Sequence, residues 1–163
     1  MIHSKDLGMM VSLGSTLAAM STANRLKVGS VIFDPDTRNI ISVGYNGTPP
    51  GEDNTCEVGG VTKDNVTHAE INALKKIRTI LLSVPVSRYK QTEWYTTGKV
   101  LYTTSSPCAD CAVQIVDYGI SRVLFTKGYD GATDGIPYLL ENNVAVERVV
   151  YDGNKGIWTT EKV

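Results

Sequence analysis

A histidine, a glutamate and two cysteines are spaced in this chain as three metal ligands and one acid/base group would be. His68 precedes Glu70 by two residues, and Cys108 and Cys111 follow farther along the chain. Imidazole nitrogen and cysteine thiolate are ligands that zinc prefers, and a catalytic zinc site uses three protein ligands and keeps the fourth position for water. His68, Cys108 and Cys111 therefore predict a catalytic zinc centre.

Glu70 is predicted to act beside the metal and not as a ligand. Two residues along a helix correspond to a rotation of about 200°, so Glu70 and His68 do not share a helix face. Cys108 and Cys111 are three apart, which places both thiols on one side of a first helical turn, directly after Pro107. Unpaired N–H groups at that helix end lower the pKa of a thiol and favour metal binding.

Three simpler interpretations of these residues are open. A C-x-x-C pair alone is also typical of redox sites, and a lone histidine usually packs in a core, but neither accounts for Glu70. Cys56 could close the zinc shell as a fourth ligand, which would make the chain a zinc-stabilised binding module without turnover. His3 and Cys56 are too few for a second zinc site.

Composition predicts one domain over residues 1–163, with 42% hydrophobic residues to fill its core. Three cysteines cannot form a disulfide framework, and the first twenty residues show no signal or membrane pattern. We therefore expect a cytoplasmic protein, or one in the host cytoplasm if the source is viral. The net charge of −1 predicts no nucleic-acid or membrane partner.

Hydrophobic periodicity predicts an alternation of helices and strands. Helices are expected at 6–23, from a Thr67 cap to Leu81, after Cys108, and at 138–141. Strands are expected at 28–33, 39–44, 99–103, 121–126 and 144–151, with a polar loop over 44–66 and an irregular stretch over 83–98. This order predicts an α/β fold in which helices cover both faces of a sheet.

Four segments together resemble the cytidine and deoxycytidylate deaminase superfamily, whose signature is H-x-E followed by P-C-x-x-C. The segments are Val28-Gly29-Ser30-Val31-Ile32, Gly44-Tyr45-Asn46-Gly47-Thr48-Pro49, His68-Ala69-Glu70-Ile71-Asn72-Ala73 and Ser106-Pro107-Cys108-Ala109-Asp110-Cys111. The Gly-Tyr-Asn-Gly segment is most similar to the deoxycytidylate branch. The resemblance implies a three-layer α/β/α sandwich around a mixed five-stranded sheet.

The resemblance also implies an activity, the zinc-dependent hydrolysis of dCMP to dUMP and ammonia, which supplies dUMP for dTMP synthesis. Glu70 would be the proton carrier between water and base. It implies substrate contacts from Asn46, Thr104, Ser106 and Tyr129. For the phosphate, the sequence offers Arg25, Lys27, Lys127 and Tyr129 as donors, and the resemblance favours Tyr129. A deaminase of another base, such as cytidine, guanine or tRNA adenosine, is the alternative enzyme.

Finally, the resemblance implies a homo-hexamer that dCTP activates and dTTP inhibits, each bound with Mg²⁺ around the Gly-Tyr-Asn-Gly loop. The residues expected to bind these effectors are Lys27, Gly44, Tyr45, Gly47, Asp53, Asn54 and Glu57.

Overall fold

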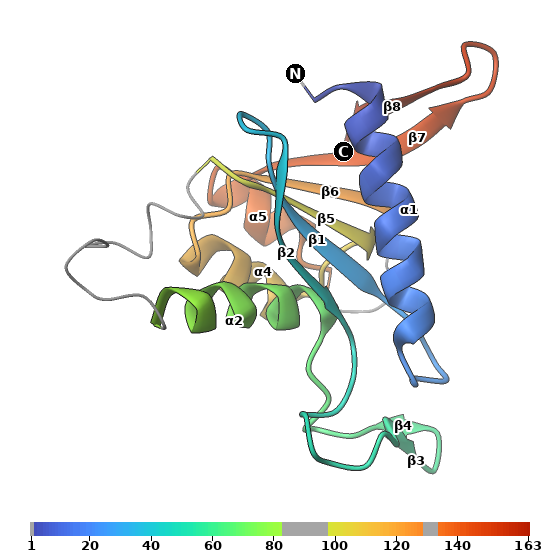
Figure 1. The fold of residues 1–163 in the computed structure, drawn as a ribbon, viewed down its shortest axis with the longest axis vertical. Helices are drawn as coiled ribbons and strands as arrows, with labels where there is room; N and C mark the ends of the chain where they lie inside the picture. The colour runs from blue at the N-terminus through green and yellow to red at the C-terminus, as the bar shows by residue number, and fades with distance from the viewer. Residues whose placement is uncertain (1, 83–97, 129–133) are drawn as a thin grey trace.

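A six-stranded mixed sheet forms the middle layer of the molecule. The computed structural model describes residues 2–82, 98–128 and 134–163. The sheet contains β1 (Gly29–Asp34), β2 (Asn39–Tyr45), β5 (Val100–Ser105), β6 (Arg122–Lys127), β7 (Ala145–Asp152) and β8 (Ile157–Lys162). The helices are α1 (Ser4–Met20), α2 (Ala69–Leu82), α4 (Ala109–Asp117) and α5 (Ile136–Glu141). Helix α1 covers one face, and α2, α4 and α5 cover the other (Figure 1).

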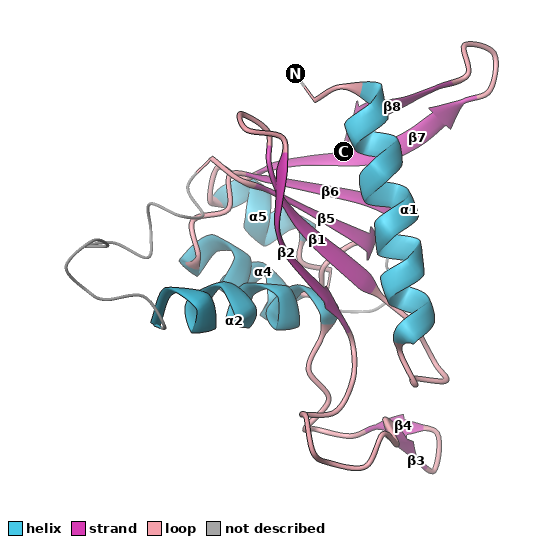
Figure 2. Cartoon of the chain, viewed as in Figure 1, coloured by secondary structure: helices cyan, strands magenta, loops and turns pink. Residues whose placement is uncertain are grey.

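The strand order places β5 near the middle of the sheet. The order is β2-β1-β5-β6-β7-β8. Strand β1 pairs antiparallel with β2 and β5, β6 pairs parallel with β5 and β7, and β8 closes the edge antiparallel to β7. Figure 2 shows the strands in magenta as a layer between the helices. The end of β5 therefore leads the chain directly from the sheet centre to Pro107 and Cys108.

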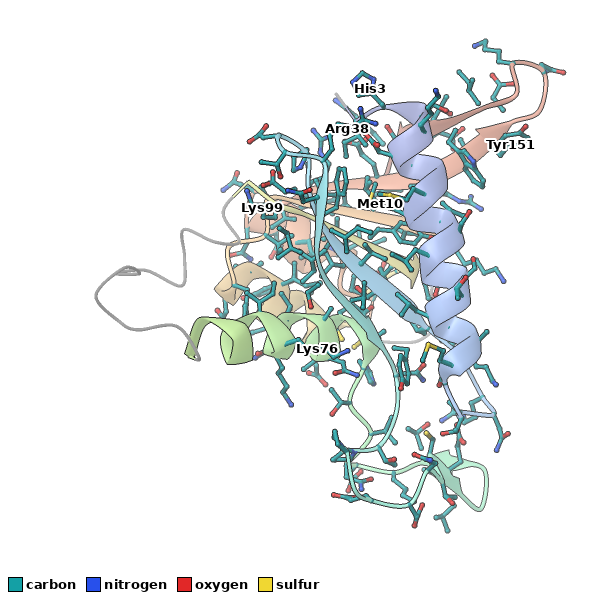
Figure 3. All side chains as sticks on the ribbon, viewed as in Figure 1. His3, Met10, Arg38, Lys76, Lys99 and Tyr151 are labelled. Atoms are coloured by element: carbon teal, nitrogen blue, oxygen red, sulfur yellow. The ribbon has the colours of Figure 1, made fainter. Side chains whose placement is uncertain are left out.

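Alternating side chains of the central strands fill two hydrophobic cores. On β1, Ile32 faces α2 and α4, whereas Val31 and Phe33 face α1. Met10, which is fully buried, fills the space between α1 and the sheet (Figure 3). Both faces of β1 and of most of β5 are buried, which is why Val31–Phe33 and Val100–Tyr102 are apolar without alternation.

The prediction of five strands was wrong, because β8 adds a sixth. Its sequence, Ile-Trp-Thr-Thr-Glu-Lys, is mostly exposed and lacks the alternation that marks a half-buried strand. The strand is held by its pairing with β7. In addition, the Trp158 backbone N–H donates to Ser4 Oγ (2.8 Å), and the Trp158 ring lies against Gly8. The contacts with Ser4 and Gly8 depend on α1, which is remote in sequence, so no local pattern predicts this strand.

The segment expected as a plain loop over 44–66 contains a small hairpin. Strands β3 (Glu57–Val58) and β4 (Val61–Thr62) pair antiparallel around Gly59 and Gly60, both of which have positive φ. Two-residue strands are too short to show a hydrophobic period. The remaining predicted elements within the described residues are present with shifted ends. The 83–97 stretch lies outside them, and no described helix is long and apolar enough to cross a bilayer.

Asp34 ties the turn between β1 and β2 to the start of β5. Its carboxylate accepts hydrogen bonds from the Asp36 N–H (3.0 Å) and the Thr37 N–H (3.4 Å), and it pairs with Lys99 Nζ (3.0 Å). Burial alone would raise the pKa of Asp34, but these donors outweigh burial and lower it from 3.8 to about 2. The folded state therefore favours the ionised carboxylate.

We expect Asp34→Asn to lower the free energy of unfolding at pH 7 by about 1 kcal/mol, because an amide cannot replace the charged acceptor. Since the pKa is lower in the folded state, this contribution is present above pH 4 and is lost as the pH falls towards 2. Urea unfolding of both proteins at pH 7 and pH 2.5 measures it. A difference that stays constant between these pH values would contradict the role given to Asp34.

Candidate metal centre and active site

His68 and Glu70 are placed by the first turn of α2. The His68 carbonyl accepts the Asn72 N–H (2.9 Å), so His68 takes the capping position predicted for Thr67, which instead pairs with Gly47. The helix starts close above β2 at Gly44, where a Cβ atom would collide with the carbonyl oxygen of Ala69. Glycine at position 44 therefore lets α2 approach the sheet, and the distance of His68 and Glu70 from the sheet depends on this close packing.

Cys108 and Cys111 are placed by the first turn of α4. Cys108 is the extended N-cap residue of the helix, and its carbonyl accepts the Ala112 N–H (2.9 Å). The segment before α5 supports this turn. Asp134 forms an isolated antiparallel β-bridge with Cys108, and the Gly135 N–H donates to the Pro107 carbonyl (2.9 Å). The N-terminal ends of α2 and α4 thus point into one site with their positive dipole ends.

The three predicted ligand atoms meet as a zinc ion requires. His68 Nδ1 lies 3.3 Å from Cys111 Sγ and 3.5 Å from Cys108 Sγ, and all three ligand atoms lie within 4.8 Å of one another. Tetrahedral zinc with ordinary Zn–N and Zn–S bonds separates its ligands by roughly 3.6 to 3.8 Å. The residues present therefore fit a zinc ion with small adjustments.

Cys56 does not belong to this group. It is buried elsewhere, with its sulfur 3.4 Å from Thr22 Oγ1, and the one cluster of metal-ligating side chains in the described parts of the chain contains only His68, Cys108 and Cys111. This arrangement provides three protein ligands, which is the number a catalytic zinc site uses. It gives no support to the closed shell that a structural zinc site needs.

The surroundings of the two thiols shift their pKa values in opposite directions. A hydrogen bond from Cys111 lowers the pKa of Cys108, and burial opposes this, while His68 and the backbone N–H of Cys111 lower it further. The same hydrogen bond, burial and Glu70 raise the pKa of Cys111. Since cysteine binds zinc as the thiolate, the lowered pKa of Cys108 favours its role as a ligand.

Glu70 is buried beside the ligand group, with its two oxygens in different surroundings. Oε1 accepts a hydrogen bond from Thr103 Oγ1 (3.2 Å), and Oε2 lies 3.7 Å from Cys111 Sγ. Burial raises the pKa of Glu70, while its own backbone N–H, the charge of His68 and the Thr103 hydroxyl oppose that shift. A buried carboxyl with a raised pKa next to a metal site is suited to take up and release a proton.

A cavity of about 200 Å³ opens onto His68, Glu70 and Cys108. Of the predicted substrate residues, Arg25, Asn46 and Ser106 line it. The sequence reasoning did not select the other lining residues, which are Ala23, Leu26, Val28, Thr62, Val66, Ala69 and Ser105. Most of these are small or apolar side chains that are brought together only by the fold. No sequence motif therefore predicts that they line the cavity.

Two predicted substrate residues are not found in this wall. Thr104 is not among the lining residues and packs towards α1, where its Oγ1 accepts the Gly29 N–H (3.1 Å) and its methyl group lies near Gly14. Tyr129 lies outside the described residues. Asn46 lines the cavity, but its amide also spans the adjacent backbone. Its Oδ1 accepts the Val28 N–H, and its Nδ2 donates to the Leu26 carbonyl (both 2.8 Å).

Among the predicted effector residues, Glu57 alone lines the cavity. Its carboxylate accepts the backbone N–H groups of Asn24 (3.1 Å) and Arg25 (3.3 Å), so it holds the segment that carries Arg25. Asp53 pairs with Lys63 (3.2 Å), and the Asn54 carbonyl accepts Thr22 Oγ1 (2.6 Å). The other four, Lys27, Gly44, Tyr45 and Gly47, lie outside the cavity wall.

We expect Cys111→Ser to reduce bound zinc to well below one ion per chain, because a hydroxyl is a far poorer zinc ligand than a thiolate. Cys56→Ser is the matched control and should keep the zinc content of the unchanged protein. Metal analysis of protein purified with zinc measures both. Loss of zinc in Cys56→Ser would instead favour a structural zinc site in which Cys56 is the fourth ligand.

A family model described as the cytidine and deoxycytidylate deaminase zinc-binding region matches residues 4–127. The match includes His68, Glu70, Cys108 and Cys111, so it covers the whole ligand group and the carboxylate described above. The resemblance seen in the sequence is thereby confirmed at the level of the family.

Individual relatives show moderate similarity. A dCMP deaminase from the cyanophage S-TIM5, solved with dCMP and dUMP, has 31% identity and a TM-score of 0.72, covering 86% of this chain and 94% of that one. The deoxycytidylate deaminase of Saccharomyces cerevisiae is 32% identical over 73% of this chain, which spans 36% of the yeast protein. A tRNA-specific adenosine deaminase of Rickettsia bellii is 31% identical over 74% of this chain and 66% of its own length. This chain belongs to the cytidine and deoxycytidylate deaminase family of zinc-dependent hydrolytic deaminases.

Proposed function

We propose that this protein converts dCMP and water to dUMP and ammonia, and so supplies dUMP for dTMP synthesis. The observation that carries the proposal is one cavity that joins the zinc-ligand group and Glu70 to the cation of Arg25. The first two features provide deamination chemistry, and the third distinguishes a nucleotide from a free nucleoside. The similarity to the cyanophage enzyme solved with dCMP and dUMP supports this substrate.

His68, Cys108 and Cys111 would hold the zinc ion. When bound, zinc lowers the pKa of a water molecule so that it can attack C4 of cytosine. Glu70 accepts a proton from the attacking water and passes it to N3 of the ring, then takes the second proton from the hydroxyl now on C4 and gives it to the departing amino group. Its burial excludes bulk water from this transfer. Because His68 is the capping residue before α2, Glu70 in the first helical turn still lies beside the ligand group.

Arg25 is the proposed contact for the 5′-phosphate. It is the cation among the described residues that line the cavity, and its Nη1 donates to Thr62 Oγ1 (3.3 Å). Glu57 binds the backbone on the N-terminal side of Arg25, which orients the segment without neutralising the guanidinium by direct pairing. Asn46 and Ser106 are proposed to contact the deoxyribose and the amino group, and Tyr129 stays a prediction.

Regulation by nucleoside triphosphates is part of the proposal. We propose that dCTP activates and dTTP inhibits a hexamer, each with Mg²⁺ on the 44–66 loop. What supports it is the bonding of this loop to the cavity wall. Thr22 donates to the Asn54 carbonyl, and Glu57 binds Asn24 and Arg25. A ligand that moves the loop would therefore move a wall of the substrate cavity.

We expect zinc-replete protein to deaminate dCMP, and we expect Glu70→Gln to lose at least about a thousandfold in kcat while keeping its zinc. The ultraviolet change from cytosine to uracil measures turnover with dCMP, cytidine and dCTP as substrates. The same assay with dCTP or dTTP plus Mg²⁺ tests regulation. Turnover of cytidine alone would favour a nucleoside deaminase, and no turnover of any substrate would favour a binding module.

We expect Arg25→Gln to raise KM for dCMP by about tenfold or more, because it removes a charged donor to the phosphate. KM for cytidine should not change, since cytidine carries no phosphate. Steady-state kinetics with both substrates measures the difference. Lys155→Gln, on the distant β7–β8 turn, is the matched loss of a positive charge and should change neither value. An equal change in KM for dCMP and cytidine in Arg25→Gln would contradict the proposal that Arg25 binds the phosphate.

A further inference from the structure

Thr103 is a fully buried polar residue in an apolar part of the sheet. On β5, Leu101 belongs to the core formed with α2 and α4, so Thr103, two residues farther, faces the same layer. Thr103 itself is 0% exposed. Valine would fill nearly the same volume without a hydroxyl to satisfy. A buried hydroxyl destabilises a fold unless it forms a hydrogen bond, so its partner identifies its role.

That partner is the carboxylate of Glu70. Thr103 Oγ1 donates to Glu70 Oε1 (3.2 Å), which links the centre of β5 to the first turn of α2. The neighbouring strand offers a contrast, because Ser30, opposite Thr103 on β1, donates to the backbone carbonyl of Tyr102 (3.0 Å). The Ser30 hydroxyl thus bonds to the sheet backbone, whereas the Thr103 hydroxyl bonds to the active-site carboxylate.

The bond makes the two oxygens of Glu70 unequal. Oε1 accepts the Thr103 hydroxyl on the sheet side, while Oε2 accepts the Cys111 thiol (3.7 Å) on the side of the ligand group, a hydrogen that Cys111 would no longer carry as a zinc-bound thiolate. Without the hydroxyl, the carboxylate could rotate about its last bond and exchange the two oxygens, because that torsion is broad. A donor on one side therefore selects one orientation.

We propose that Thr103 is a positioning residue that binds Oε1 and leaves Oε2 as the single oxygen that carries the proton during deamination. The inference rests on the proposed deaminase function. Oε2 takes one proton from the attacking water and gives it to N3, then takes the second proton from the hydroxyl now on C4 and gives it to the departing amino group, so Glu70 returns to its starting state after each turnover. Thr103 keeps its own hydrogen throughout, and it is not among the residues that line the cavity.

The test compares Thr103→Val, which removes the hydroxyl, with Thr103→Ser, which keeps it. Thr126→Val is the matched control, because Thr126 also donates inside the sheet, to the Thr104 carbonyl (3.1 Å), but lies away from Glu70. We expect Thr103→Val to lower kcat by about tenfold to a hundredfold, in line with the loss of a hydrogen bond to a charged group. KM should stay within about twofold, as expected when ground-state binding is unchanged.

Rescue by serine separates positioning from packing. Thr103→Ser should return kcat to within about threefold of the unchanged protein, and Thr126→Val should leave it unaltered. A kcat for Thr103→Val within twofold of the unchanged protein, or equal losses in the valine and serine variants, would overturn the inference. Thr103→Ala takes the place of the valine variant if that variant does not fold.

A second readout does not depend on turnover. Infrared spectra of zinc-loaded protein with ¹³C-labelled glutamate, taken with and without Glu70→Gln, identify the carboxylate band of Glu70. Thr103→Val should shift that band and Thr103→Ser should not, and an unshifted band would overturn the inference.

The substrate is tested separately. If the unchanged protein deaminates cytidine but not dCMP, the proposed substrate is wrong and the Thr103 comparison is made with cytidine. If it deaminates neither, both proposals fail.

Discussion

The meeting of two helix N-termini over the end of β5 is the constraint on which the site depends. Helices α2 and α4 direct their positive dipole ends towards the same small volume, which is unfavourable unless negative charge lies between them. The lowered pKa of Cys108 favours a negative thiolate at this point, and the three ligand atoms that lie there fit a zinc ion. The ligands and the helix ends therefore stabilise each other.

The helix starts are in turn held by contacts remote in sequence. Gly44 brings α2 down onto β2, and the segment at Gly135 supports the turn before α4. Thr103 then joins α2 to the central strand through Glu70. Each of these contacts positions a side chain of the site, so the sheet acts as the common reference for ligands that come from separate parts of the chain.

The sequence was sufficient for the ligands and the carboxylate because their chemistry depends on residue type and short spacing. His68, Cys108 and Cys111 meet as their pattern predicts. It was insufficient where position depends on tertiary packing. Strand β8 is held by pairing with β7 and by α1, and Thr104 and Ser105, adjacent in sequence, differ in whether they reach the cavity because successive strand residues face opposite sides. A motif gives residue order, whereas a cavity wall depends on which face each residue takes.

Gly44 illustrates how a residue without a side chain can influence chemistry. The sequence motif that contains it suggests contact with an effector, yet its position against Ala69 means that any larger residue would lift the start of α2. His68 and Glu70 would move together, away from the cysteines on α4. In a mutational scan of this loop, damage at position 44 would thus resemble a defect in metal affinity and turnover, and only residues whose replacement spares both can report on the binding of regulators.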